Sequence, residues 1–182
     1  AELRALMQRE AIDTAAVHVD AGAPTGLYFV THGPSGHVFT YRRAGSAASR
    51  MTPADLDPAY IASARFLHAS GISQAISDTA PETVAAAIAM ARRAGVRVSY
   101  DTNFRPRLWT AETARPVIEA AAAQADILKT SVEDAAALFG LSTPAELSVE
   151  VSARAQALPD DGEKVALEFA HEICAKAGEV GT

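Results

Sequence analysis

The spacing of apolar residues predicts alternating strands and helices between residues 65 and 140. Val84, Ile88 and Ala91 recur at helical spacing before Gly95, a typical helix stop. Helices are expected over residues 81–94, 110–124 and 131–139. Short apolar runs predict strands over residues 65–70, 96–101 and 126–130. Strands that alternate with helices indicate a parallel sheet covered by helices, so the expected fold class is α/β.

The first third of the chain predicts a helix and then a β-hairpin. Apolar positions share one face of a helix expected over residues 2–10. Two short strands are expected over Leu27–His32 and His37–Arg43, and the Gly and Pro residues between them predict a turn. Further on, a helix is expected to begin near Asp57, because Pro58 suits a first helical position.

The C-terminal part of the chain has a different pattern. Residues 142–160 are rich in Ala, Ser and Pro and show no clear periodicity. A helix is expected from about residue 160 to residue 177, because Asp160 and Glu163 have the spacing of a capping box. An apolar stripe supports this helix and consists of Val165, Phe169 and Ile173.

Charge argues against some classes of partner. The 182 residues carry a formal net charge of -6, and the pI is about 5.3. Binding to nucleic acid or to an anionic membrane needs clustered Lys and Arg, whereas the basic residues here come in pairs such as Arg42-Arg43 and Arg92-Arg93. We therefore expect no nucleic-acid partner and no membrane partner. A small anionic substrate remains compatible with a few converging Arg residues.

Cysteine content and the missing sequence motifs narrow the functional classes further. The single cysteine, Cys174, allows no internal disulfide and fits a cytoplasmic protein. The five histidines have no zinc-type spacing with it. The sequence holds no G-x-G-x-x-G, no Walker A loop and no G-x-S-x-G. These absences give no support to a dinucleotide fold, a P-loop enzyme or an α/β-hydrolase.

Ligands of doubly wound sheets bind at the carboxyl ends of the strands, so the segment after residue 101 is the first candidate for chemistry. Asn103 offers amide donors and an acceptor, and Arg105 offers a planar fork suited to a carboxylate or a phosphate. The alternative is that Arg105 and Arg107 are solvated loop charges and that Trp109 anchors the next helix. Residue chemistry alone leaves both interpretations open and favours the alternative.

Two further groups are weaker candidates. Tyr41 and Arg42 on the expected hairpin could hold a sugar acid, although charges on an edge strand also protect against aggregation. Ser131 and Asp134 follow the strand that ends near Lys129. Asp134 could order Mg²⁺ through water and Lys129 could reach a phosphate, but Ser131 and Asp134 also have the spacing of a helix cap.

Five motifs, taken in order, are similar to the pfkB, or ribokinase-like, sugar kinases. They are Pro24-Thr25-Gly26-Leu27-Tyr28-Phe29; Val38 to Arg43; Phe66-Leu67-His68-Ala69-Ser70-Gly71-Ile72; Asp101-Thr102-Asn103-Phe104-Arg105 with Leu108-Trp109; and Ser131-Val132-Glu133-Asp134 with Leu138-Phe139-Gly140. Within that family the chain most resembles 2-keto-3-deoxygluconate kinases. The resemblance covers residues 1–148.

The resemblance implies a three-layer α/β/α fold with a mainly parallel sheet and a small β-hairpin lid over residues 24–50. It implies transfer of the γ-phosphoryl group of ATP, with Mg²⁺, to a sugar hydroxyl, here that of a sugar acid. Substrate contacts would fall to Tyr41, Arg42 and Arg105, with Arg105 also near the transferring phosphate. Cofactor contacts would fall to Asn103, Lys129 and Ser131, and the metal to Asp134, where the family usually has Glu. The lid often forms a subunit interface in this family, so a homo-oligomer is expected.

The family's N-terminal Gly-rich segment and its Gly-Ala-Gly-Asp loop, which carries the general base, do not occur in these 182 residues. We therefore expect an incomplete fold: a partial kinase domain over residues 1–148 and an unmatched tail over residues 149–182. Three hypotheses follow. The chain is part of a sugar-acid kinase, a degenerate kinase domain that binds a sugar acid or a partner subunit without catalysis, or part of a kinase for another sugar such as fructose or ribose.

Overall fold

A computed structural model describes residues 2–34 and 36–141 and contains the predicted parallel sheet. Its three strands, in spatial order, are β3 (Phe66–Ser70), β4 (Arg97–Asp101) and β5 (Ile127–Lys129). Both neighbouring pairs are parallel. Their carboxyl ends therefore lie at one edge of the sheet, which is where the candidate residues were expected.

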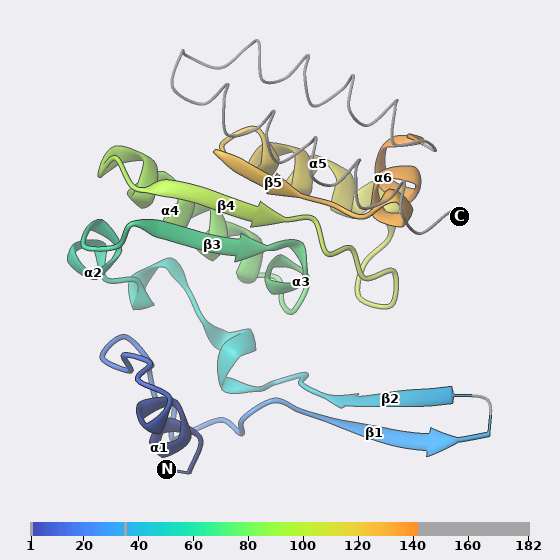
Figure 1. Cartoon of the computed structure of the whole chain (residues 1–182), viewed down its shortest axis with the longest axis horizontal. Helices are drawn as coiled ribbons and strands as arrows, with labels where there is room; N and C mark the ends of the chain where they lie inside the picture. The colour runs from blue at the N-terminus through green and yellow to red at the C-terminus, as the bar shows by residue number, and fades with distance from the viewer. Residues whose placement is uncertain (1, 35, 142–182) are drawn as a thin grey trace.

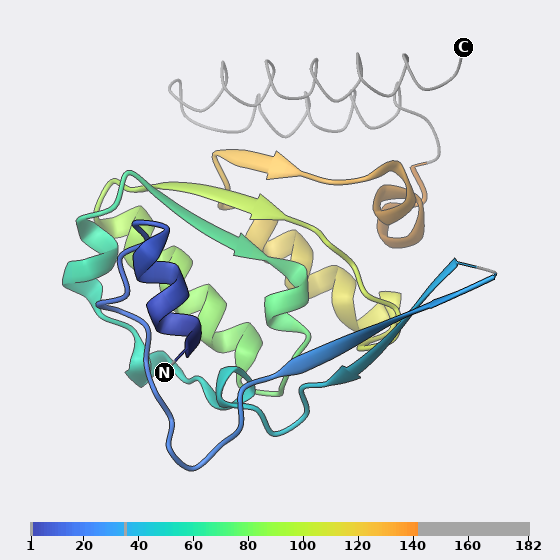
Figure 2. The same cartoon turned by 60° about the horizontal axis from the view of Figure 1, so that its bottom comes forward.

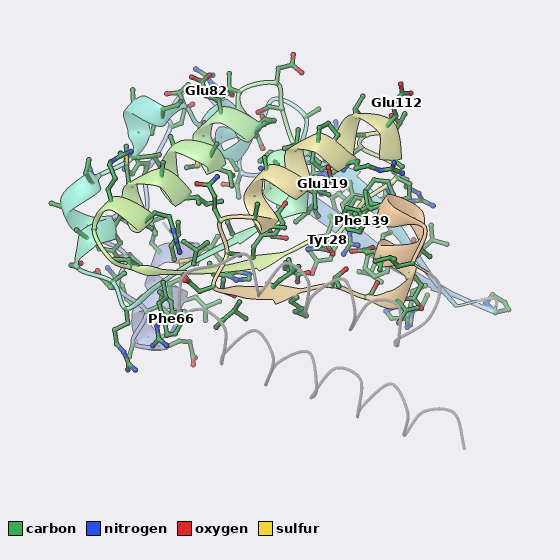
Figure 3. All side chains as sticks on the ribbon, turned by 90° about the horizontal axis from the view of Figure 1, so that it is seen from above. Tyr28, Phe66, Glu82, Glu112, Glu119 and Phe139 are labelled. Atoms are coloured by element: carbon green, nitrogen blue, oxygen red, sulfur yellow. The ribbon has the colours of Figure 1, made fainter. Side chains whose placement is uncertain are left out.

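Helices α4 (Ala80–Arg93) and α5 (Ala111–Ala122) connect these strands and lie together on one face of the sheet (Figure 1). Figure 3 shows Glu82 and Glu112 on the outer side of this helix layer, away from the sheet. Side chains of β4 alternate, so that Val98 and Tyr100 are fully buried under the helices. Together with Ile88, Ile118 and Leu138 they form the centre of the hydrophobic core.

The predicted ends of the helices coincide with their capping residues. Thr110 accepts a hydrogen bond from the backbone N–H of Thr113 and begins α5. Ser131 caps α6 (Val132–Phe139) in the same way, and Gly140 ends it with a φ of 72°. Asp57 caps α2 (Pro58–Ala62), as Pro58 predicted. The strands and helices expected between residues 65 and 140 are therefore confirmed within two residues at each end.

The predicted hairpin is also confirmed, as β1 (Leu27–Gly33) and β2 (Gly36–Arg42). All residues of both strands whose side chains are described are exposed. Figure 1 shows the hairpin extending past the carboxyl ends of β3 and β4, on the side toward which these strands point. Figure 2 shows the same direction from a second angle.

Some elements differ from expectation. The four-residue helix α3 (Gly71–Gln74) follows β3 directly and was not predicted. The helix predicted over residues 2–10 is α1 (Glu2–Arg9). Two short 3-10 helices, Ala47–Arg50 and Pro53–Asp55, lie between the hairpin and α2. The helix predicted from residue 160 lies outside the described residues, and within the described part no helix is long and apolar enough to cross a membrane.

Candidate functional site

The ends of β3 and β4 meet closely at the functional edge. Asn103 adopts a positive φ of 35°, and its Nδ2 donates a hydrogen bond to the hydroxyl of Ser70 at 3.1 Å. Directly after Ser70, a Cβ on Gly71 would stand 2.1 Å from the carbonyl oxygen of Thr102. Only glycine permits this approach of two backbones. The structure thus places Asn103 beside the carboxyl end of β3, where its side-chain amide is hydrogen-bonded to Ser70.

Asp134, expected near a metal, holds the segment after β4. Its Oδ2 accepts a hydrogen bond from the hydroxyl of Thr102 at 2.8 Å and another from the backbone N–H of Phe104 at 2.9 Å. Its own backbone N–H donates to the hydroxyl of Ser131 at 3.1 Å. Asp134 and Ser131 therefore lie together, and the Asp134 carboxylate joins the first turn of α6 to the loop after β4.

Arg105 and Lys129 differ in whether their charge is already paired within the protein. The Nη1 of Arg105 donates to the neighbouring carbonyl of Phe104 at 3.0 Å, and the residue is exposed. In the described ranges Arg105 forms no ion pair. The Nζ of Lys129 lies 2.9 Å from Oδ2 of Asp101, its partner across the two strands. Arg105 is therefore open to an anion, whereas the charge of Lys129 is partly satisfied by a carboxylate.

The hairpin places Tyr41 and Arg42, which were both expected to bind the sugar, on different faces. Tyr41 and Arg42 are neighbours on β2, so their side chains point to opposite faces of the hairpin. Tyr41 lies directly across from Tyr28, with 6.2 Å between ring centroids. The guanidinium of Arg43 lies over the ring of Tyr41, 4.5 Å from its centroid. The face of Tyr41 therefore carries Tyr28 and Arg43, while Arg42 is paired with Leu27 on the other face.

The sequence did not lead us to expect Tyr28 beside Tyr41 or Arg43 over its ring, although the signal was available. An alternation of two residues along a strand places Tyr41 and Arg43 on one side, and any hairpin turn near residue 35 brings Tyr28 close to Tyr41. Arg43 is also half-buried, unlike Arg42, which is exposed. An arginine side chain that is already held in place loses less conformational entropy on binding an anion than a free one does.

Two titratable groups near the edge have shifted pKa values. Burial raises the pKa of Tyr100, and the nearby charge of Asp101 adds to this shift. The hydroxyl of Tyr100 donates to Oε1 of Gln74, which ties β4 to α3 beneath the edge. The backbone N–H of Glu133 and the hydroxyl of Ser131 lower the pKa of Glu133. Glu133 is therefore a stable anion in the first turn of α6, where a carboxylate is favourable.

A family model described as pfkB family carbohydrate kinase matches residues 1–167 of the chain. The chain belongs to the pfkB family. The match extends past residue 148, where the sequence motifs alone placed the end of the resemblance. The domain boundary expected there falls on residues outside the described part, so it stays a prediction.

Relatives of this pfkB chain include kinases for different sugars. The 2-dehydro-3-deoxygluconokinase of Thermoproteus tenax is 39% identical over 140 residues, which are 74% of this chain and 42% of that protein. Fructokinase-1 of Oryza sativa is 35% identical over 143 residues, 78% of this chain and 44% of that protein. A solved PfkB protein from Polaromonas sp. JS666 superposes with a TM-score of 0.75 at 34% identity, covering 94% of this chain and 52% of that one. The ribokinase-like fold class is confirmed, and the chain spans less than half the length of the two curated relatives.

The described part of this pfkB chain holds few carboxylates that could meet a Mg²⁺ ion bound to ATP phosphates. Magnesium in phosphoryl-transfer enzymes is bound through one or two carboxylates together with substrate phosphates. The part of the chain that the structure describes holds no group of three His, Cys, Asp or Glu side chains suited to a metal. Oδ2 of Asp134 already accepts two hydrogen bonds, and Asp101 is paired with Lys129. The carboxylates of Asp134 and Asp101 are therefore both used to hold protein segments together.

Proposed function

We propose that the intact protein transfers a phosphoryl group from ATP to a sugar acid, with 2-keto-3-deoxygluconate as substrate and its 6-phosphate as product. The observation that carries the proposal is the hairpin face on which the Arg43 guanidinium covers the ring of Tyr41, opposite Tyr28. A fixed guanidinium suits a carboxylate, which neutral sugars lack. The identity with the 2-dehydro-3-deoxygluconokinase of Thermoproteus tenax supports the same substrate class.

In the proposed reaction, a sugar hydroxyl oxygen bonds to the γ-phosphorus of ATP while the bond from that phosphorus to the ADP oxygen breaks. The hydroxyl proton passes to a base. Because such transfer depends mainly on positioning and charge stabilisation, Arg105 is assigned to the transferring group and the face of Tyr41 to the sugar acid. Asn103 and Ser131 are assigned to the ATP side of the edge, with Lys129 in a minor role. Mg²⁺ accompanies ATP and neutralises phosphate charge when bound.

A matched pair of arginine variants tests this assignment in the intact protein, with ADP release measured at saturating MgATP. Arg43→Ala removes the cation beside Tyr41, and Arg42→Ala removes its neighbour on the opposite face. A hydrogen bond to a charged group contributes about 1.5–3 kcal/mol, so Arg43→Ala is expected to lower kcat/KM for 2-keto-3-deoxygluconate by roughly 10- to 150-fold. Arg42→Ala is expected to lower it by less than about threefold. Equal effects, or a larger effect at Arg42, would contradict the choice of face.

Fructose phosphorylation is the second candidate, because rice fructokinase-1 is 35% identical over 143 residues. A neutral sugar has no carboxylate for Arg43. Turnover of fructose or ribose that exceeds turnover of the sugar acid, and that changes little in Arg43→Ala, would favour this candidate over the first. Loss of sugar-acid turnover in the same variant, with fructose turnover unchanged, would favour the sugar acid.

We also propose that two copies of the chain associate through the hairpin. Large apolar side chains are exposed on both of its faces, and they include Leu27, Phe29, Val30, Val38 and Phe39. A two-stranded hairpin is marginally stable alone, so its second face gains stability from a partner. Phe29 and Val38 lie on the face opposite Tyr41, where a second copy would cover them. Phe29→Lys is therefore expected to shift the mass measured by light scattering from dimer to monomer, and an unchanged monomeric mass for both proteins would contradict this proposal.

A further inference from the structure

One carboxylate oxygen connects three segments of the candidate site. Oδ2 of Asp134 lies 2.8 Å from the hydroxyl of Thr102 and 2.9 Å from the backbone nitrogen of Phe104. The hydroxyl of Thr102 also lies 2.9 Å from that of Thr130. A carboxylate can only accept, so the hydroxyl of Thr102 donates to Asp134, while the hydroxyl of Thr130 beside it donates to the carbonyl of Ser131 at 3.3 Å. The segments after β4 and β5 and the first turn of α6 are therefore tied at a single point.

We propose that Asp134 is a positioning residue that sets the conformation of residues 102–104 and thereby the placement of Asn103 and Arg105. This rests on the proposed function of the edge. Asn103 has a positive φ of 35°, which surrounding contacts must maintain. Its side chain is held by Ser70, and the residues on either side of it are held by Asp134. Arg105 follows directly, so its starting point is fixed by the same bonds.

Burial makes this connection difficult to replace. Thr102 is completely buried, and its backbone N–H donates to the carbonyl of Lys129 at 2.9 Å. Phe104 is 7% exposed. Water is therefore poorly able to take over the two donors if Asp134 is removed, and a buried donor without an acceptor is unfavourable. The carboxylate of Asp134 is thus committed to the protein's own loop, which differs from the metal-associated role that the family resemblance implies for this position.

Hydrogen exchange in the full chain tests the connection without any need for activity. Asp134→Ala removes the acceptor, and exchange of the Phe104 amide is expected to accelerate at least about tenfold. Thr102→Val removes the hydroxyl from the same oxygen and is expected to accelerate it about two- to fivefold. Glu133→Gln is the matched control, because Glu133 is the neighbouring acid and its pKa is lowered by its own N–H and Ser131. Exchange at Phe104 that is unchanged in Asp134→Ala would overturn the proposal.

Steady-state kinetics of the intact protein then distinguish positioning from metal binding. If Asp134 positions the loop, Asp134→Asn and Thr102→Val both lower kcat, and their double variant is no worse than the more severe single variant. The Mg²⁺ concentration for half-maximal rate stays within twofold of the wild type in all three. A Mg²⁺ requirement raised tenfold in Asp134→Asn, with Thr102→Val unaffected, would overturn the proposal in favour of a metal ligand. A protein with no kinase activity would refute the proposed function, and the exchange rates would still decide whether the connection exists.

Discussion

Gly71→Ala tests whether the ends of β3 and β4 must touch. A Cβ at this position would stand 2.1 Å from the carbonyl oxygen of Thr102. Cβ atoms essentially never come within 3.0 Å of a heavy atom outside their own and adjacent residues, so one backbone must move by about 1 Å. The obstacle is a backbone atom, and no change of rotamer can relieve the contact.

Thr102 has little freedom to make this movement. It is fully buried, its N–H donates to the carbonyl of Lys129, and its hydroxyl donates to Asp134. The new methyl group would also lie 3.4 Å from Cδ1 of Ile118, which is an ordinary contact. The cost therefore comes from the backbone clash. Overpacking of a buried site costs about 1–3 kcal/mol, and we expect Gly71→Ala to lie at the upper end, near 3 kcal/mol.

Urea unfolding followed by tryptophan fluorescence measures this change, because Trp109 is the single tryptophan and packs against the core. The matched control is Gly33→Ala in the exposed hairpin, where the nearest heavy atom to a new Cβ is 3.9 Å away. The control is expected to change the free energy of unfolding by less than about 0.5 kcal/mol. A Gly71→Ala protein that is as stable as the control would refute the close approach of the two strands.

Three further predictions concern the same framework. The folded state raises the pKa of Tyr100, so the stability that the neutral hydroxyl contributes is fully present below the unfolded pKa of about 10. Above that pH this contribution is lost, by up to about 1.4 kcal/mol per pH unit. In urea unfolding between pH 8 and about 11.5, the free energy of unfolding of Tyr100→Phe should therefore decline less steeply than that of the wild type, and equal slopes would contradict this. Asp126→Ala removes the carboxylate that accepts a hydrogen bond from the buried N–H of Val98, and it should lower the free energy of unfolding by about 2 kcal/mol. The control Asp78→Ala, at an exposed position, should leave it almost unchanged. Ser131→Ala removes the side-chain oxygen that caps α6 and should lower the free energy of unfolding by about 1 kcal/mol, with an unchanged value arguing against the cap.

Hydrophobic periodicity and capping residues were sufficient to predict the sheet and its helices. These signals act within one element, where the relevant contacts are a few residues apart. The helix α3 was missed because four residues, Gly71–Gln74, are too few to show a period. Its position depends on a contact with Thr102, about thirty residues further along the chain.

The sequence predicted at which edge of the sheet the candidate residues lie, and only some of their contacts. The parallel sheet placed Asn103 and Asp134 at one edge, and the structure brings them together there. The bonds of Asp134 to Thr102 and Phe104 depend on how β4 and β5 are aligned, which no local pattern specifies. The pairing of Lys129 with Asp101 depends on the same alignment. The placement of Arg43 on the same face as Tyr41, by contrast, could have been predicted from strand alternation alone.

The hairpin has one further consequence, which concerns how substrate range can change in this family. Its two faces differ in chemistry: Tyr28 and Tyr41 lie on one, and Leu27 and Arg42 on the other. Because side chains alternate, a shift of β2 by one residue against β1 would move every β2 side chain to the opposite face, while those of β1 stay in place. A single insertion or deletion in the turn near residue 35 that shifted β2 in this way would therefore take Tyr41 and Arg43 away from the face that we propose for the sugar acid. If the proposed role of this face holds, a change in turn length would alter specificity without any substitution at Tyr41 or Arg43.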